Sequence, residues 1–195
     1  MGILRTIALC PVALVGASAA HAADLGAYVD SKPRDFADRF EFRLGGFAHG
    51  LGSVERNTSA VNLELDSPRL FPPVNAWWGF LLPRAYAAGM INVNGATSSI
   101  RAGANWLLPF TEQIFGEIYL GGAVHDGSLV GSADQNALGS RVLFNVGASL
   151  GYRFAPRWSA MVTFDHLSNG NGVFGTGFAR NQGINSVGAR LSYAF

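Results

Sequence analysis

Apolar and polar residues alternate along most of the chain, and this pattern predicts the fold. In 142–154, for example, large apolar side chains take every second position and Asn145 and Arg153 lie between them. A two-residue period is typical of β-strands, because successive side chains of a strand point to opposite faces. Seven segments show it clearly: 39–49, 61–65, 98–108, 114–124, 142–154, 158–168 and 184–195. An eighth, about 80–91, is ambiguous because Pro83 and apolar residues on both faces blur the pattern.

The less apolar face of these segments distinguishes two all-β architectures. A soluble barrel or sandwich would turn its apolar face inward, whereas a membrane barrel turns it toward lipid. Besides small residues, the polar face carries seven charged ones: Arg43, Glu64, Arg101, Glu117, Arg141, Arg153 and Arg190. Because these charges can pair inside a narrow lumen, we expect an all-β, eight-stranded antiparallel transmembrane β-barrel. A soluble, secreted all-β domain is the alternative.

The connections between the segments alternate in length. Short turns that contain proline alternate with longer loops rich in Gly, Asn and Ser; the turns are 108–112 and 155–157, and the loops lie near 51–58, 126–139 and 169–183. Short periplasmic turns and longer outer loops are typical of outer-membrane barrels. This alternation therefore favours the membrane barrel over the soluble domain.

Two further features concern the periplasmic side of the expected barrel. The Pro-rich stretch from Ser67 to Asn75 is too long for a tight turn, so we expect a longer periplasmic connection with Trp77 and Trp78 at the membrane interface. The final residue, Phe195, follows apolar residues at alternating positions. This ending resembles the C-terminal signal of bacterial outer-membrane proteins.

The N-terminus indicates where the protein is located, and the composition excludes two classes of protein. Arg5, an apolar run from Ile7 to Val15 and Ala20-His21-Ala22 form the three regions of a secretory signal peptide. We therefore expect a signal peptide at 1–22 and a barrel domain at 23–195 in the bacterial cell outer membrane. With 14% charged residues, 12% aromatic residues and a net charge of +1, the chain is neither disordered nor a basic nucleic-acid binder.

A candidate hydrolytic site lies near the end of 158–168. His166 and Ser168 share the outward face, and ten residues beyond Trp158 correspond to a rise of roughly 25 Å through the membrane. That height matches the interface of the outer leaflet, where the ester bonds of lipid A lie. Asn185, ten residues before Phe195, reaches a similar height on the neighbouring segment. Together the three side chains suit a nucleophile, a base and a group that orients the base. Alternatively, His166 and Ser168 are ordinary polar residues of the headgroup zone.

A family resemblance rests on two motifs. His166-Leu167-Ser168-Asn169, a Gly-rich loop and Asn181-Gln182-Gly183-Ile184-Asn185 resemble the PagL-type lipid A 3-O-deacylases, and weaker similarity extends upstream to Trp78. Members of this family are eight-stranded outer-membrane barrels that hydrolyse the acyl ester at the 3-position of lipid A. The resemblance implies that Ser168 is the nucleophile and His166 the general base. It also implies that Asn169 and Asn181 lie near the oxyanion or shape the loop.

One position departs from the family pattern, because its best-known members have a glutamate where this chain has Asn185. An amide cannot supply the charge that stabilises an imidazolium, but its oxygen can accept a hydrogen bond from the histidine. Asp165 is adjacent to His166, yet the strand period points it into the lumen.

The expected function is therefore that of an outer-membrane esterase that removes the 3-O-acyl chain of lipid A by a Ser-His mechanism. The expected partners are lipid A or lipopolysaccharide as substrate and outer-membrane lipid around the barrel; a homodimer is left open. No cofactor, metal or nucleic acid is expected. The alternative is a small outer-membrane barrel without enzymatic activity, with a structural or adhesin-like role.

Overall fold

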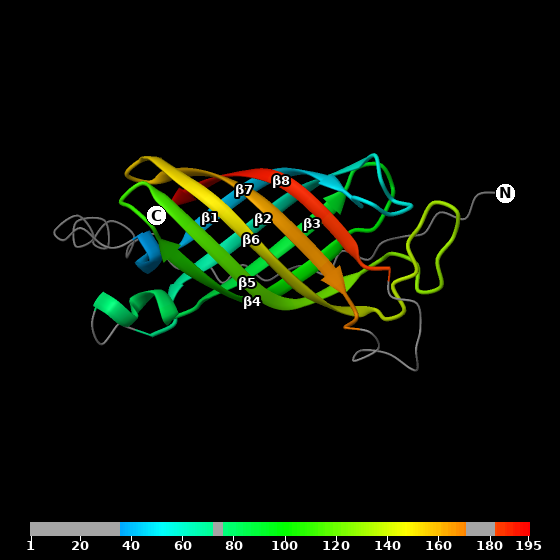
Figure 1. Cartoon of the computed structure of the whole chain (residues 1–195), viewed down its shortest axis with the longest axis horizontal. Coiled ribbons are helices and arrows are strands. Elements are labelled where there is room, and N and C mark those ends of the chain that lie inside the picture. Colours follow the sequence, from blue (N-terminus) through cyan, green and yellow to red (C-terminus); the bar gives the residue numbers. More distant parts are fainter. Residues whose placement is uncertain (1–35, 72–75, 171–181) are drawn as a thin grey trace, which may run out of the picture. The chain divides into compact units, whose positions relative to one another are not determined.

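The computed structural model describes residues 36–71, 76–170 and 182–195, and its strands are labelled in Figure 1. These residues form eight strands, namely β1 (Glu41–His49), β2 (Thr58–Arg69), β3 (Arg84–Asn92), β4 (Ser99–Pro109), β5 (Ile114–His125), β6 (Val142–Ala155), β7 (Trp158–Ser168) and β8 (Ile184–Ala194). Two short 3-10 helices, η2 (Phe36–Asp38) and η3 (Ala76–Leu81), accompany them. In the described residues, no helix has both the length and the apolar character needed to cross a membrane.

The eight strands form a closed antiparallel barrel. Each strand pairs with its neighbours in sequence, and β1 also pairs with β8, which closes the sheet. The predicted fold class is confirmed, and the ambiguous segment is β3. This strand starts at Arg84, directly after Pro83, whose ring nitrogen cannot donate a ladder hydrogen bond. β2 is longer than the predicted 61–65, and its register with β3 shifts between Asp66 and Arg69.

The connections have different lengths at the two ends of the barrel. Figure 1 shows the turns between β4 and β5 and between β6 and β7 at one end, together with η2 and η3. The loops 50–57, 93–98 and 126–141 extend from the opposite end. Short turns and the long loops near 51–58 and 126–139 thus alternate as predicted, while most of the predicted loop 169–183 lies outside the described residues. The predicted signal peptide lies outside the described residues, as do the side chains of Trp77 and Trp78.

Apolar side chains cover the outside of the barrel. Along β1, buried and exposed residues alternate strictly, and the exposed ones include Phe42 and Leu44. Ile100 on β4 is 76% exposed and Val162 on β7 is 61% exposed. A continuous apolar surface of this kind suits contact with hydrocarbon and would be unfavourable in water.

Paired charges fill the inside of the barrel, with Arg43 at their centre. Its guanidinium lies 3.0 Å from a carboxylate oxygen of Glu41, 2.8 Å from Glu64, 3.1 Å from Asp66 and 2.6 Å from Glu117. Further buried pairs connect Arg84 with Glu41, Arg190 with Glu64, and Arg101 with Asp165. Such pairing is required because an unpaired charge in this interior would be very costly.

The predicted lumen charges are confirmed for five of the seven residues, because Arg43, Glu64, Arg101, Glu117 and Arg190 are buried. The prediction was wrong for Arg141. That residue precedes β6, is exposed, and donates to the carbonyl of Gly127 at 2.6 Å. Arg153 is half-buried and lies over the rings of Phe36 and Phe115, at 4.7 and 4.9 Å from their centroids.

Candidate active site at the loop end of β7 and β8

The last residues of β7 present two polar side chains on an otherwise apolar outer face. His166 and Ser168 are half-buried, whereas Asp165 and Leu167, which alternate with them, are buried inside. Phe164 and Val162 precede His166 on the same outer face and are exposed. The predicted outward orientation of His166 and Ser168 is therefore confirmed.

Asn185 on β8 lies directly opposite His166 in the strand register. Nδ1 of His166 and Oδ1 of Asn185 are 2.7 Å apart. An amide oxygen only accepts hydrogen bonds, so Nδ1 carries the proton in this contact. Nε2 of the neutral ring is then unprotonated and can act as a base. The side chains of His166 and Asn185 therefore converge as predicted.

Gly183, the residue directly before β8, lies against the His166 ring. Its φ of 61° is in the left-handed region, where a side chain is strained. A Cβ atom on Gly183 would lie 3.1 Å from Cε1 of His166 and 3.0 Å from the carbonyl oxygen of Leu167. Glycine at this position therefore allows the backbone to approach the imidazole closely.

Asn169 and Asn181 were predicted to lie near the oxyanion or to shape the loop. Asn169 is fully buried, and its Nδ2 donates to the carbonyl of Leu138 at 3.0 Å. This bond connects the end of β7 to the loop 126–141. Asn181 lies outside the described residues.

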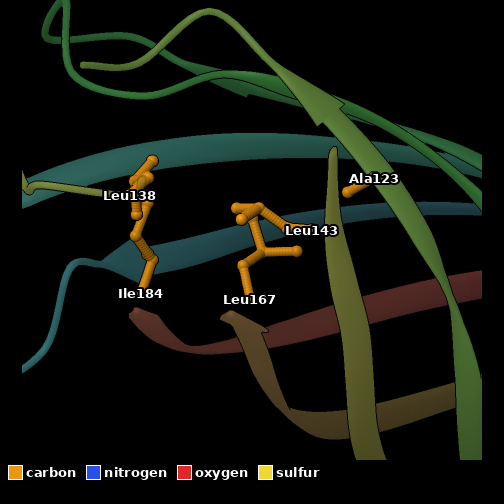
Figure 2. Packing of buried hydrophobic residues seen from close by; sticks show 5 residues of the cluster. All are labelled: Ala123, Leu138, Leu143, Leu167 and Ile184. Carbon is orange, nitrogen blue, oxygen red and sulfur yellow. The ribbon is translucent and has the colours of Figure 1, made fainter. Parts of the chain in front are cut away.

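A buried apolar cluster supports both strand ends from inside. Figure 2 shows Leu138, Leu143, Leu167 and Ile184, with Ala123 nearby. Leu167 lies between His166 and Ser168 in sequence, and Ile184 precedes Asn185. The side chains of Leu167 and Ile184 are packed inside the barrel. The polar residues next to them in sequence therefore point outward in a fixed direction.

The side chain of Asp165 points into the interior of the barrel, as predicted from the strand period. Its carboxylate lies 2.7 Å from Nη1 of Arg101 and accepts hydrogen bonds from Tyr119 at 2.7 Å and from Asn145 at 2.8 Å. These three contacts hold the carboxylate away from the outer face. Asp165 therefore does not replace the missing acid beside His166.

An apolar groove of about 380 Å³ runs along the outer face of β5 to β8. Ala160 and Val162 of β7 and Ala189 of β8 contribute to its wall, together with Leu150 and Tyr152 of β6. Val162 and Ala189 each lie four residues from the His166–Asn185 pair along their strands. At about 3.3 Å per residue, the groove begins roughly 13 Å from the polar pair.

Within the described part of the chain, no group of three or more His, Cys, Asp and Glu side chains is arranged to hold a metal ion. Two further histidines of the described residues lie at strand ends. His49 and His125 are buried, and Nε2 of His125 lies 2.6 Å from the carbonyl oxygen of Ser140. Sequence reasoning missed Glu55 and Asn136, two buried loop residues close to this end of the barrel. Loop position alone gave no signal for them.

Comparisons with known proteins agree with this geometry. A crystal structure described as the outer membrane enzyme PagL is similar with a TM-score of 0.57 and 21% identity, over 80% of this chain and 99% of that one. Neisserial surface protein A has a TM-score of 0.53 and 13% identity, over 80% of this chain and 97% of that one. The N-terminal barrel of Pseudomonas aeruginosa OprF has a TM-score of 0.52 and 13% identity, over 81% and 98%. At these identities, the similarities establish the fold alone.

No curated protein sequence matches the chain. The family model for lipid A 3-O-deacylase (PagL), however, matches residues 75–194. This range covers β3 to β8 and includes His166, Ser168, Asn169, Asn181 and Asn185. The chain therefore belongs to the lipid A 3-O-deacylase family.

Proposed function

We propose that this protein removes the 3-O-acyl chain of lipid A in the outer membrane, with Ser168 as nucleophile and His166 as general base. The observation that carries the proposal is the 2.7 Å contact between Nδ1 of His166 and Oδ1 of Asn185. It gives the imidazole the tautomer and the orientation that a serine hydrolase needs. Family membership supplies the substrate class, because this family acts on lipid A.

In the proposed reaction, Nε2 of His166 takes the proton of the Ser168 hydroxyl while its oxygen attacks the ester carbonyl. The tetrahedral intermediate collapses as His166 returns the proton to the leaving 3-hydroxyl of lipid A, which leaves an acyl ester on Ser168. Water then attacks this ester with His166 again as base, and the fatty acid is released. Backbone amides that follow Ser168, from Asn169 and Gly170, are suitable donors to the oxyanion.

Asn185 acts in this scheme as an orienting group without charge. Its oxygen fixes the ring, but it does not stabilise the imidazolium as a carboxylate would. We therefore expect an active enzyme with a lower kcat than a family member with glutamate in this place. The groove below the pair offers an apolar surface for the acyl chain, so that the chain stays at the level of the hydrocarbon during the reaction.

The decisive experiment is mass spectrometry of lipid A from bacterial membranes that express the protein. Loss of one 3-hydroxyacyl chain with the wild type, and its retention with Ser168→Ala and with His166→Ala, would support the proposal. Ser159→Ala is a suitable control, because this serine is buried and faces the interior from the same strand. Unchanged lipid A in every strain, including one with Asn185→Glu, would instead favour a barrel without enzymatic activity.

Two further proposals concern the mature protein. We propose that residues 1–22 are removed as a signal peptide, which N-terminal sequencing of the protein from outer membranes would test by finding Ala23 first. We also propose that the protein forms a homodimer. Sedimentation in detergent micelles at several protein concentrations would distinguish a monomer from a dimer.

A further inference from the structure

One buried carboxylate of the barrel belongs to a loop and is paired with no arginine among the described residues. Glu55 lies in the loop between β1 and β2, yet it is only 1% exposed. Its neighbours are hydrogen-bond donors: the amide of Thr97 at 3.1 Å, the hydroxyl of Thr97 at 2.8 Å and the amide of Asn136 at 3.0 Å. Nε2 of His49 lies 3.3 Å away. Burial of a carboxylate is favourable only when such donors satisfy it.

Hydrogen bonds within the loop 50–57 hold the Glu55 side chain in its inward position. Gly50 has a φ of 68°, and its carbonyl accepts hydrogen bonds from the amide and the hydroxyl of Ser53. The hydroxyl of Ser53 in turn accepts from the amide of Glu55 at 3.2 Å, and Thr58 donates to the Glu55 carbonyl at 2.8 Å. The carboxylate thus has a fixed position, at which it joins the loops 93–98 and 126–141.

Asn136 extends this connection to the candidate active site. It is fully buried, and while its amide donates to Glu55, its Nδ2 donates to the carbonyl of Gly183 at 2.9 Å. Gly183 is the residue that lies against the His166 ring. The adjacent residues strengthen this contact, because Ala137 and Gln182 exchange hydrogen bonds of 2.7 and 3.1 Å.

The same loop also contacts the orienting residue directly. The amide of Leu51 donates to the backbone carbonyl of Asn185 at 2.8 Å. Residues of one loop therefore reach Asn185 and the residue beside the His166 ring: Leu51 reaches Asn185, and Glu55 reaches Gly183 through Asn136. This arrangement would fix the start of β8 relative to the end of β7.

We propose that Glu55 and Asn136 are positioning residues for deacylation, which hold Gly183 and thereby the His166 imidazole in its working geometry. The inference rests on the proposed roles of His166 and Ser168. Neither residue contacts substrate in this scheme. Their effect is on the alignment of the base with the nucleophile, and a misplacement of about 1 Å can lower a rate by about a hundredfold.

The test compares Asn136→Ala with Asn94→Ala. Asn94 is a matched control because its side chain also bonds to a backbone at this end of the barrel, to the amide of Ser59 at 2.7 Å, but has no described connection to Gly183. With purified lipid A in detergent micelles, we expect Asn136→Ala to lower kcat by about tenfold to a hundredfold with KM changed little. Asn94→Ala should leave both unchanged.

A second readout does not depend on activity. In protein labelled with ¹⁵N-histidine, the Nδ1 signal of His166 reports its hydrogen bond to Asn185, and Asn136→Ala should shift or broaden this signal while Asn94→Ala does not. If lipid A is not cleaved even by the wild type, the proposed function fails, and this signal still tests the positioning. Equal effects of the two variants on the signal, or none, would overturn the positioning role.

Glu55→Gln completes the test. The new amide presents donor hydrogens to the donors of Thr97 and Asn136, so we expect a similar loss of kcat, again with little change in KM. Because both residues act through Gly183, the double variant with Asn136→Ala should lose little more than either single variant. Losses that multiply in the double variant would contradict a common route. Asp126→Asn is the matched control, since Asp126 also accepts from a loop amide, that of Ser98 at 2.7 Å.

Discussion

Nδ1 of His166 and Oδ1 of Asn185 lie 2.7 Å apart across the paired ends of β7 and β8. The strand register itself brings the two residues opposite each other, so their contact does not depend on a flexible loop. In the proposed mechanism, Asn185 is the uncharged third member of a Ser-His-Asn triad. The consequences can be tested separately for the charge of that member, for the packing around the ring and for the barrel that supports both.

A negative charge at position 185 should accelerate the reaction. Asn185→Asp keeps the size of the side chain and converts a neutral hydrogen bond to a charge-assisted one, so we expect kcat to rise by about tenfold. Asn185→Leu removes the acceptor and should lower kcat by about a hundredfold or more. Steady-state kinetics on lipid A in micelles measure both. Equal kcat values for all three proteins would show that Asn185 does not orient the base.

A side chain at position 183 should disturb the imidazole. Gly183→Ala places a Cβ atom 3.1 Å from Cε1 of His166, and we expect kcat to fall by about tenfold or more as the ring is displaced. Gly52→Ala is the control, because Gly52 has a similar positive φ of 74° with open space around it. Both variants carry the backbone strain of about 1–2 kcal/mol, but only the first contacts the base. Similar activities of the two variants would contradict the prediction.

Removal of Arg43 should destabilise the barrel strongly. Arg43→Met leaves Glu41, Glu64, Asp66 and Glu117 with fewer cationic partners in a buried interior, and we expect a loss of about 3–5 kcal/mol in the free energy of unfolding. Asp38→Ala breaks a partly exposed pair with Arg69 and should cost at most about 1 kcal/mol. Urea unfolding of the barrel in lipid vesicles measures both. A small loss with Arg43→Met would mean that the acids find other partners or become protonated.

A charged residue on the outer face should destabilise the barrel only where that face contacts hydrocarbon. Ile118 lies midway along β5 and is 48% exposed, so Ile118→Arg is expected to cost about 2–4 kcal/mol in a bilayer. Val130 in the loop 126–141 is 74% exposed, and Val130→Arg should change stability little. Unfolding from lipid vesicles distinguishes the two. Equal stabilities would mean that β5 does not contact lipid at this depth.

Acid should weaken the connection through Glu55. Burial alone would raise the pKa of Glu55, but the neighbouring His49 and the hydrogen bonds from Asn136 and Thr97 outweigh it and hold the pKa below its ordinary value of 4.5. A carboxyl group with a lowered pKa in the folded state stabilises that state above 4.5, and this contribution disappears as the pH falls through the lowered pKa.

Thermal unfolding in detergent from neutral to acidic pH tests this expectation. Wild type should be more stable than Glu55→Gln at neutral pH, and the difference should shrink below pH 4.5. A difference that stays constant with pH would show that the charge of Glu55 is not what stabilises the loops.

Most of the fold could be predicted from the sequence, because strand alternation is a local property that a single chain displays directly. The outward direction of His166 and Ser168 and the inward direction of Asp165 followed from it, and the height of Asn185 followed from the count of residues along its strand. The prediction failed for Arg141, which the alternation assigned to the lumen although β6 starts one residue later. A strand boundary depends on hydrogen bonds to a neighbouring strand, and these are not visible in one segment.

The loop contacts of the site could not be predicted for a related reason. Glu55, Asn136 and Gly183 are separated by 81 and 47 residues, and each lies in a stretch without periodicity. Only closure of the barrel brings the three loops to one end, where a buried carboxylate can accept hydrogen bonds from residues of the other loops. The sequence predicted which face of each strand is functional, but not how the loops hold it.

The charges that surround Arg43 also determine how permeable the barrel is to water and solutes. Arginine and carboxylate side chains from β1, β2 and β5 meet across the interior at 2.6 to 3.1 Å, and Tyr86 and Tyr119 pack there with ring centroids 5.7 Å apart. An interior occupied in this way leaves little room for a column of water or for passing solutes. The protein can thus expose a hydrolytic surface to lipid while the permeability barrier of the outer membrane stays intact.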